Sequence, residues 1–186
     1  CRKSEDQDMT RTSTRLLAAS LMLSAAPSAF ADKIFVSNER DNTVTVIDSD
    51  TLKVIKSIKT GKRPRGIVIT PDYKELIVCI GDDNRLDVID TDKLEVVRSY
   101  PASGPDPELL AINHKGDRIY VANEDDGLVT VLDRATGKSI TEIPVGVEPE
   151  GMAVSPDDSL VVNTSEQTSM AHLIDAKTNQ VLDNIL

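Results

Sequence analysis

The chain has 186 residues, of which 31 are acidic and 21 are basic, and its formal net charge is −10. Nucleic acid and anionic membrane surfaces are therefore poor partners, because both repel a negatively charged protein. The same charge favours a cationic protein partner, such as a basic electron carrier, although it also serves solubility alone.

The N-terminal residues have the pattern of processing segments. Residues 1–8 are charged and polar and stand before the first methionine, so we interpret them as non-native or upstream read-through. Residues 9–31 read as a secretory signal peptide: Arg11 and Arg15 come first, an apolar run follows, and small residues predict cleavage after Ala31. The alternative is a buried helix. The apolar run is too short to cross a bilayer, which takes about 20 residues. We expect export, most simply to a bacterial periplasm, and no transmembrane span.

A short block of alternating apolar residues recurs along the rest of the chain. It ends each time at an aspartate, as VTVID at Asp48, LDVID at Asp90, VTVLD at Asp133 and AHLID at Asp175. These aspartates are 42, 43 and 42 residues apart. A period of about 40–45 residues made of short strands is typical of a β-propeller blade.

Other residues keep the same period. They are Gly61, Gly104 and Gly146, and Pro64, Pro107 and Pro149, which we call the register prolines. Within one period, apolar stretches at 66–69, 76–80, 86–89 and 95–100 are separated by residues typical of turns. These stretches predict the four strands of one blade.

The sequence therefore predicts an all-β fold, a β-propeller with four-stranded blades. Its repeats occupy residues 32–186, as a partial blade at 33–60 that lacks its innermost strand and full blades at 65–101, 108–144 and 150–186. A seven-bladed ring needs about 300 residues at this period. We interpret the chain as the N-terminal half of such a ring. The alternative is a half that associates with a copy of itself.

Residues suited to catalysis are sparse. The two histidines, His114 in a predicted turn and His172 in a predicted strand, stand apart from any catalytic or metal-binding motif, so we expect structural roles for both. Cys79 lies in an apolar stretch and is expected to be a buried hydrophobic residue. No Cys-x-x-Cys-His motif for covalent haem occurs. We expect no catalytic residue and no bound metal or cofactor in this segment.

The candidate binding residues belong to loops at one end of the predicted channel. The position after each register proline, where the chain enters the innermost strand, is charged: it holds Arg65, Glu108 and Glu150. Arg63 lies just before the first register proline, Pro64. Charged groups at these positions converge on the channel mouth, where they could bind a small anion or a charged loop of a partner. Salt bridges between blades are the alternative.

A second candidate set follows the second strand of each blade. It includes Asn38, Glu39, Asn123 and Glu124. Such oxygen-rich turns can hold Ca²⁺, but asparagine and aspartate also favour turns because their side chains bond to nearby backbone. We expect turn chemistry here.

Several segments resemble a known family. SNERDNTVTVID, GKRPRGI, SGPDPE, ANEDDGLVTVLD and VGVEPEGMAVSPD look like consecutive blades of YVTN-type β-propeller proteins, and especially of the PQQ-dependent catabolism-associated β-propeller group. The resemblance covers residues 33–186. It implies a periplasmic, non-catalytic binding or scaffold protein that serves a quinoprotein alcohol oxidation pathway. A quinoprotein dehydrogenase or a c-type cytochrome is then the expected protein partner.

Two other functions stay open. The first is a propeller enzyme, either a lactonase-like hydrolase or an oxidoreductase, because one fold hosts many activities. The second is a cell-surface adhesion or antigen propeller. Direct binding of pyrroloquinoline quinone is not expected, because the resemblance to quinoprotein sites would require tryptophan and the chain has none.

Overall fold

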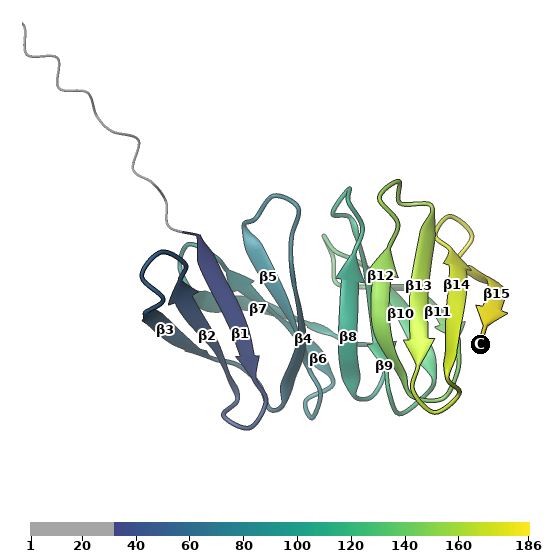
Figure 1. The fold of residues 1–186 in the computed structure, drawn as a ribbon, viewed down its shortest axis with the longest axis horizontal. Helices are drawn as coiled ribbons and strands as arrows, with labels where there is room; N and C mark the ends of the chain where they lie inside the picture. The colour runs from purple at the N-terminus through teal and green to yellow at the C-terminus, as the bar shows by residue number, and fades with distance from the viewer. Residues whose placement is uncertain (1–31) are drawn as a thin grey trace, which may run out of the picture. The chain divides into compact units, whose positions relative to one another are not determined.

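Short apolar stretches form the strands that the sequence predicts; some alternate with polar residues, as in Thr43–Asp48, and others are continuous, as in Glu75–Ile80. The computed structural model describes residues 32–186, which fold into strands and turns without a helix (Figure 1). The first sheet contains β1 (Lys33–Asn38), β2 (Thr43–Asp48) and β3 (Val54–Lys59). The second contains β4 (Pro64–Ile69), β5 (Glu75–Ile80), β6 (Arg85–Asp90) and β7 (Glu95–Pro101).

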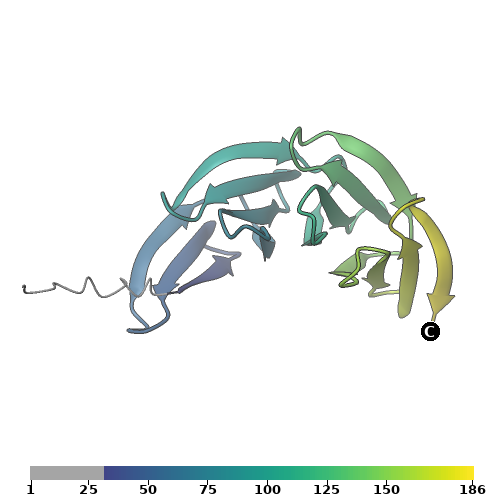
Figure 2. The same cartoon turned by 90° about the horizontal axis from the view of Figure 1, so that it is seen from above.

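The other two sheets repeat the second. The third contains β8 (Pro107–Ile112), β9 (Arg118–Asn123), β10 (Leu128–Asp133) and β11 (Ser139–Pro144). The fourth contains β12 (Pro149–Val154), β13 (Leu160–Ser165), β14 (Met170–Asp175) and β15 (Gln180–Ile185). Within each sheet, strands that are consecutive in the sequence pair antiparallel. Figure 2 shows these four sheets along an arc, with the first strand of each full sheet on the concave side.

The all-β prediction, with four-stranded blades and an incomplete first one, is confirmed. The first sheet has three strands, and β1 stands at the repeat position of β5, β9 and β13. The innermost strand, represented by β4, β8 and β12 elsewhere, has no counterpart in the first sheet among the described residues. The predicted seven-bladed ring stays a prediction.

The aspartate that ends each repeated block has a local structural role. The Asp48 carboxylate accepts hydrogen bonds from the backbone N–H of Asp50 and Thr51 in the following turn, and Asp133 accepts one from Thr136. The hydroxyl groups of Thr51 and Thr136 donate to the same two carboxylates, and these backbone and side-chain hydrogen bonds lower the pKa of both carboxyl groups. The aspartate that recurs most regularly in the repeat therefore stabilises the turn before the outermost strand.

Apolar side chains fill the three junctions between consecutive sheets. Each full sheet has a preceding face, toward the sheet before it, and a following face, toward the next one. In the second sheet, Leu76 and Val78 belong to the preceding face and pack at the first junction. Ile77 and Cys79 alternate with them and pack at the second junction. Burial raises the pKa of the Cys79 thiol well above its usual value, as suits a hydrophobic residue.

The N-terminal predictions fall outside the part of the chain that the structure describes. These are the read-through segment 1–8, the signal peptide 9–31 and its cleavage after Ala31. Across residues 32–186, no helix is long and apolar enough to cross a membrane.

Candidate functional site

The candidate site lies at the end of the sheets where the register prolines begin the innermost strands. Six charged residues from three sheets meet there, and we call them the mouth cluster: Glu39, Arg63, Arg65, Asp106, Glu108 and Glu124. Five of the six were predicted as binding residues from the sequence. The structure brings them together, while a binding role stays a prediction.

Glu108 is the centre of the mouth cluster. Its side chain is 1% exposed and accepts bonds from two guanidinium groups of the second sheet. Arg63 Nη2 lies 2.6 Å from Glu108 Oε1, and Arg65 Nη2 lies 2.5 Å from Glu108 Oε2. Both carboxylate oxygens are thus engaged across the second junction.

The other acidic groups surround Arg63. Its guanidinium pairs with Asp106 of the third sheet, and its Nη2 lies 3.7 Å from Glu124 Oε2. Glu39 of the first sheet reaches both arginines, at 3.1 Å from Arg65 Nη1 and 3.4 Å from Arg63 Nε. The salt-bridge alternative raised from the sequence therefore describes how these side chains are arranged.

The backbone before each register proline aims these side chains. Arg63, Asp106 and Glu148 have φ angles of 60°, 47° and 54°, in the left-handed region that L-residues other than asparagine and aspartate seldom adopt. Asn42 Oδ1 accepts the backbone N–H of Arg63, and Asn84 Oδ1 accepts that of Asp106, each at 2.9 Å. The turn asparagines thus hold the loops in this conformation.

Close approach of two innermost strands also brings the charges together. A Cβ atom on Gly66 would lie 2.7 Å from the carbonyl oxygen of Glu108, so only glycine fits there without a shift. Strand β4 can consequently lie against β8, which leaves Arg65 within reach of the Glu108 carboxylate.

Burial governs the electrostatics of the cluster. Loss of water raises the pKa of Glu108 to about 7, and the neighbouring Glu124 carboxyl adds to this, while Arg65 and Arg63 act in the opposite direction. Burial also raises the pKa of Asp106. Burial by itself lowers the pKa of the Arg63 and Arg65 guanidinium groups, but their acidic neighbours together outweigh it, so both pKa values are raised and the arginines stay charged.

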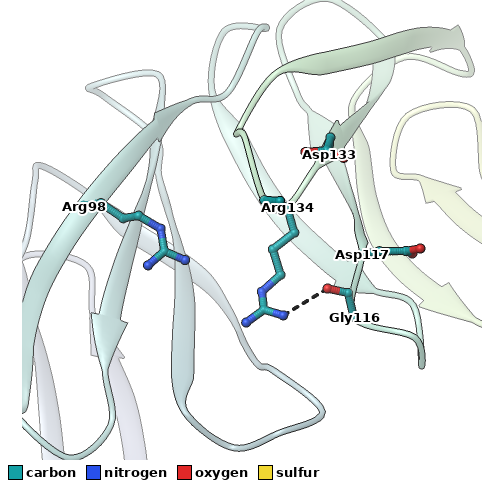
Figure 3. Close-up of a pocket in the computed structure, with 6 residues that line it drawn as sticks. Arg98, Gly116, Asp117, Asp133 and Arg134 are labelled. Carbon is teal, nitrogen blue, oxygen red and sulfur yellow. Dashed lines mark hydrogen bonds between the residues drawn. The ribbon is translucent and has the colours of Figure 1, made fainter.

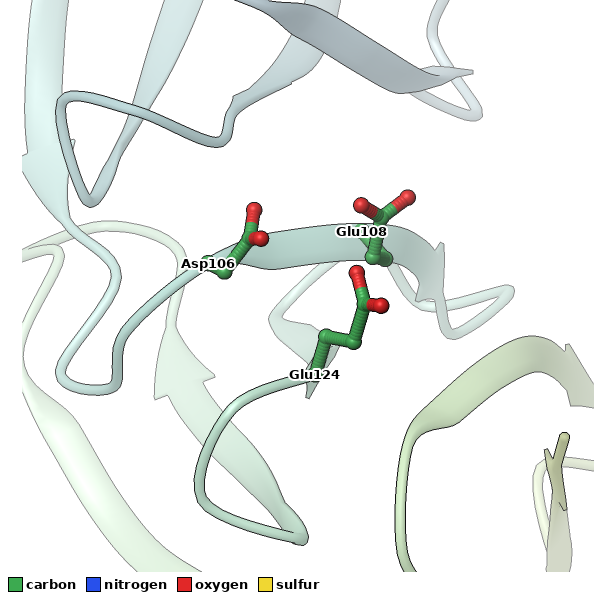
Figure 4. Close-up of side chains that lie close together, drawn as sticks. All are labelled: Asp106, Glu108 and Glu124. Atoms are coloured by element: carbon green, nitrogen blue, oxygen red, sulfur yellow. The ribbon is translucent and has the colours of Figure 1, made fainter. Parts of the chain in front are cut away.

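Three of the acidic groups lie close enough to be compared with a metal site. One carboxylate oxygen of each of Asp106, Glu108 and Glu124 lies within 4.8 Å of the other two. Figure 4 shows the three side chains close together. Arg63 contacts all three carboxylates. A guanidinium thus already supplies the positive charge that a cation would bring, so the arrangement serves as an ion-pair network.

The remaining predicted binding residues, Asn38, Asn123 and Glu150, take no part in the ion pairs of the mouth cluster. Asn38 Nδ2 donates to Thr45 Oγ1 at 2.8 Å, and Asn123 Nδ2 donates to Thr130 Oγ1 at 2.7 Å. Asn123 is fully buried. Glu150 begins the fourth sheet, half-buried, and has no ion pair with any residue between 32 and 186.

Sequence reasoning missed Asp106. It is the repeat equivalent of Arg63, 43 residues later, so the same register that selected Arg63 could have selected it. The two histidines were expected to be structural, and both bond within the protein. His172 Nε2 accepts the backbone N–H of Gly146 at 3.0 Å, and His114 Nδ1 lies 2.8 Å from Asp158 Oδ1.

A second charged group at the opposite end of the sheets was also missed. Glu75 binds Arg98 of its own sheet at 2.7 Å and Arg134 of the third sheet at 3.0 Å. A groove of about 330 Å³ lies beside the two arginines, and Arg134 also donates to the Gly116 carbonyl there (Figure 3). Tyr100 links both arginines, because its hydroxyl accepts from Arg98 and donates to the Arg134 carbonyl.

The mouth loops differ sharply in charge between the two halves of the described residues. In the third and fourth sheets these loops span residues 102–108, 123–128, 145–151 and 165–170. They carry eight acidic residues and no basic one. The corresponding loops of the first two sheets include Arg40, Lys62, Arg63 and Arg65.

Comparison with known proteins supports the repeat architecture. The model of the YNCE-like β-propeller family matches residues 12–91. No curated protein is similar enough to count as a relative. Among 1391 similar chains of solved structures is one from Kuenenia stuttgartiensis hydrazine synthase, with 23% sequence identity and a TM-score of 0.77.

The alignment with that structure covers 82% of this chain and 45% of the hydrazine synthase chain. This chain thus spans less than half of the length of the structure it matches. At such low identity the likeness concerns the fold alone, and folds of this kind host unrelated functions. Together, the repeat period, the four antiparallel sheets and both matches identify the chain as a β-propeller repeat protein, similar over residues 12–91 to YNCE-like β-propellers.

Proposed function

We propose that this propeller is a non-catalytic binding protein that docks a cationic protein partner at its mouth. The observation that carries the proposal is the charge of the mouth loops in the third and fourth sheets, with eight acidic residues and no basic one. A surface of one sign speeds encounter with partners of the opposite sign and repels others.

The acidic side chains available to a partner are those outside the ion-pair network. Asp125 and Glu166 are exposed and have no ion pair with any residue of 32–186, whereas Glu108 is held by two arginines. The network would keep the loops rigid, and the exposed carboxylates beside it would contact the partner. Recognition by loops on a rigid scaffold is common.

The setting of the proposal comes from the sequence. The signal-like residues 9–31 support an exported, periplasmic protein. The resemblance to propellers associated with PQQ-dependent catabolism supports a place in a quinoprotein alcohol oxidation pathway. The partner would then be a quinoprotein dehydrogenase or a c-type cytochrome with a basic surface. The role is one of binding and positioning, without turnover of its own.

Capture from a periplasmic extract of alcohol-grown cells tests this function. The immobilised protein should retain a haem-containing or quinoprotein partner at low salt and release it at high salt, because the contact is electrostatic. The double variant Asp125→Asn/Glu166→Gln should retain several-fold less.

A matched variant supplies the control. Asp50→Asn/Asp92→Asn changes the net charge equally, but both residues are exposed in turns at the opposite end of the sheets. It should capture as well as the unchanged protein. Equal losses in both variants, or recovery of no dehydrogenase and no cytochrome, would contradict the proposal.

A further inference from the structure

A side chain of the third strand holds the loop before the innermost strand in two of the described sheets. In the second sheet, the backbone N–H of Gly61 donates to Asp87 Oδ2 at 2.9 Å. In the fourth sheet, the backbone N–H of Gly146 donates to His172 Nε2 at 3.0 Å. Asp87 and His172 occupy the same repeat position, 85 residues or two periods apart. The third sheet has Thr130 there, and its hydroxyl accepts a bond from an asparagine side chain instead. The same anchor point is therefore built from a different chemical group in each sheet.

The two acceptors are oriented in the same way. Ser99 Oγ donates to Asp87 Oδ1 at 2.7 Å. Asn184, at the repeat position of Ser99, places its Oδ1 2.6 Å from His172 Nδ1. An amide oxygen can only accept, so Nδ1 carries the ring proton. Nε2 is then the nitrogen with the free lone pair, as the bond from Gly146 requires. The bond to Gly146 therefore exists only while the imidazole is neutral.

Gly146 packs directly on the ring and on its neighbours. His172 is only 4% exposed. A Cβ atom added to Gly146 would lie 2.8 Å from His172 Nε2. It would also lie 2.5 Å from Ser165 Oγ and from Thr168 Oγ1, so only glycine fits there without a shift. No water lies between the amide and the ring in so close a contact, and the direct hydrogen bond is the anchor of the loop.

A second proton on the ring would reverse the role of Nε2. An imidazolium ring donates from both nitrogens, so Nε2 would change from an acceptor into a donor. Its N–H could donate to Ser165 Oγ, which lies 3.0 Å away, but the N–H of Gly146 would then face another donor. A buried N–H without an acceptor is costly, so we expect the loop to withdraw. A carboxylate such as Asp87 only accepts, so the loop at Gly61 should not respond.

The charged residues on the elements next to the ring do not bond to it. All of them are acidic: residues 124–126, Glu142, Glu148, Glu166, Asp175 and Asp183. Within residues 32–186 the ring bonds to Gly146, Ser165 and Asn184. A proton on the ring therefore acts first on these hydrogen bonds and not on an ion pair.

We propose that His172 is a proton-sensitive latch of the mouth loop 145–151, which the neutral ring holds and the protonated ring releases. Histidine is the side chain that ordinarily changes its charge between about pH 5 and pH 8. The loop contains Glu148 and Glu150, so its release would displace two carboxylates of the mouth. Only this consequence for partner docking rests on the proposed function, because the latch acts whatever binds at the mouth.

Amide hydrogen exchange of the unchanged protein, resolved by residue at two pH values, tests the latch. After correction for the intrinsic effect of pH, protection of the Gly146 amide should be at least about tenfold lower at about pH 5 than at about pH 7.5. The Gly61 amide, held by Asp87, should keep its protection and serves as the internal reference. An NMR titration of the His172 ring over the same range shows whether the ring takes up the proton.

Two variants at histidine positions complete the test. His172→Asp copies the arrangement of the second sheet, so Gly146 should be protected equally at both pH values. His114→Gln removes the only other histidine of the chain, which bonds to Asp158, and should leave the pH response of Gly146 unchanged.

Four results would overturn the latch. In the unchanged protein these are equal protection of Gly146 at both pH values, or a His172 ring that stays neutral at about pH 5. In the variants they are a pH response that persists in His172→Asp, or one that vanishes in His114→Gln. Should His172→Asp fail to fold, as judged by circular dichroism, the ring titration and His114→Gln still decide.

Discussion

The second and third junctions have the same strand geometry but different chemistry. At the second junction, the arginines of β4 and its loop pair with Asp106 and Glu108 of the third sheet. At the third junction, the equivalent positions hold Asp106 and Glu108 on one side and Glu148 and Glu150 on the other, so no ion pair can form between them. The apolar positions thus define the fold of each repeat. The charged positions at the mouth differ from one repeat to the next, and they determine whether ion pairs form at a junction.

The largest loss of stability should follow from replacing Tyr100, because its side chain makes both apolar and polar contacts at the second junction. Tyr100 packs in the second junction and its hydroxyl joins Arg98 to the Arg134 carbonyl. Replacement by alanine should lower the free energy of unfolding by about 4 kcal/mol. Ile143→Ala, at the equivalent apolar position of the third junction, should cost about 3 kcal/mol. Urea unfolding of both variants measures the difference.

A milder substitution isolates the polar part of this contact. Tyr100→Phe should cost only about 1 kcal/mol, because it removes the hydroxyl and keeps the ring. If Tyr100→Phe costs as much as Tyr100→Ala, the apolar account of the junction is wrong.

Removing the guanidinium group of Arg63 should give the next largest loss of unfolding free energy. Arg63→Met keeps the apolar stem of the side chain but leaves Asp106 and the buried Glu108 with less positive charge. We expect a loss of about 3 kcal/mol at slightly alkaline pH, because an uncompensated buried carboxylate is costly. Arg40→Met is the matched control; Arg40 is exposed and makes no ion pair with the described residues, so urea unfolding should show no change beyond about 0.5 kcal/mol.

The pH dependence of stability gives a further test of the charged groups at the second junction. Burial raises the pKa of Glu108 from 4.5 to about 7, so the folded protein holds a proton that the unfolded chain releases. The linked stability is full below about pH 4.5 and is lost as the pH rises through about 7. Relative to Glu108→Gln, the unchanged protein should lose roughly 2 kcal/mol of unfolding free energy between about pH 5 and pH 8.

Taking the difference between the two proteins cancels the other titrating groups, including Asp106 and Asp126, whose pKa values burial also raises. Parallel stability curves for the two proteins would show that Glu108 does not titrate in this range.

The smallest effect should be found at the third junction. Glu150→Arg places a cation among the acidic residues of the mouth, at the repeat position of Glu108. Stability should rise by about 0.5 kcal/mol at low salt and return to the original value at high salt, because the site is only half-buried. Thermal unfolding at two salt concentrations measures this. A loss of stability at low salt would mean that Glu150 has a favourable interaction that the ion-pair pattern does not reveal.

The sequence predicted what the repeat dictates. Strands, turn aspartates and junction residues were predictable because each structural requirement appears up to four times, as at Asp48, Asp90, Asp133 and Asp175. The convergence of Arg63, Arg65 and Glu108 at one end followed from the same register.

The sequence could not predict which residue each charged side chain pairs with. Arg63 reaches the next sheet only because Gly66 allows β4 to approach β8, and such a distance is not encoded in spacing. The bridge from Glu75 to Arg134 depends on residues 59 positions apart that differ in type from their repeat equivalents, so no regularity marked them. Individual side-chain partners depend on packing between sheets, which the period does not specify.

The pairing of strands with sequence neighbours alone has a consequence for the covalent chain. No strand of residues 32–186 crosses from one sheet to another, and the second and third sheets are joined by a short loop in which Ser103 is exposed. Proteolytic cleavage at that loop would leave every sheet intact. The two fragments would stay associated only through the second junction, so their tendency to separate would report directly on the strength of that one contact.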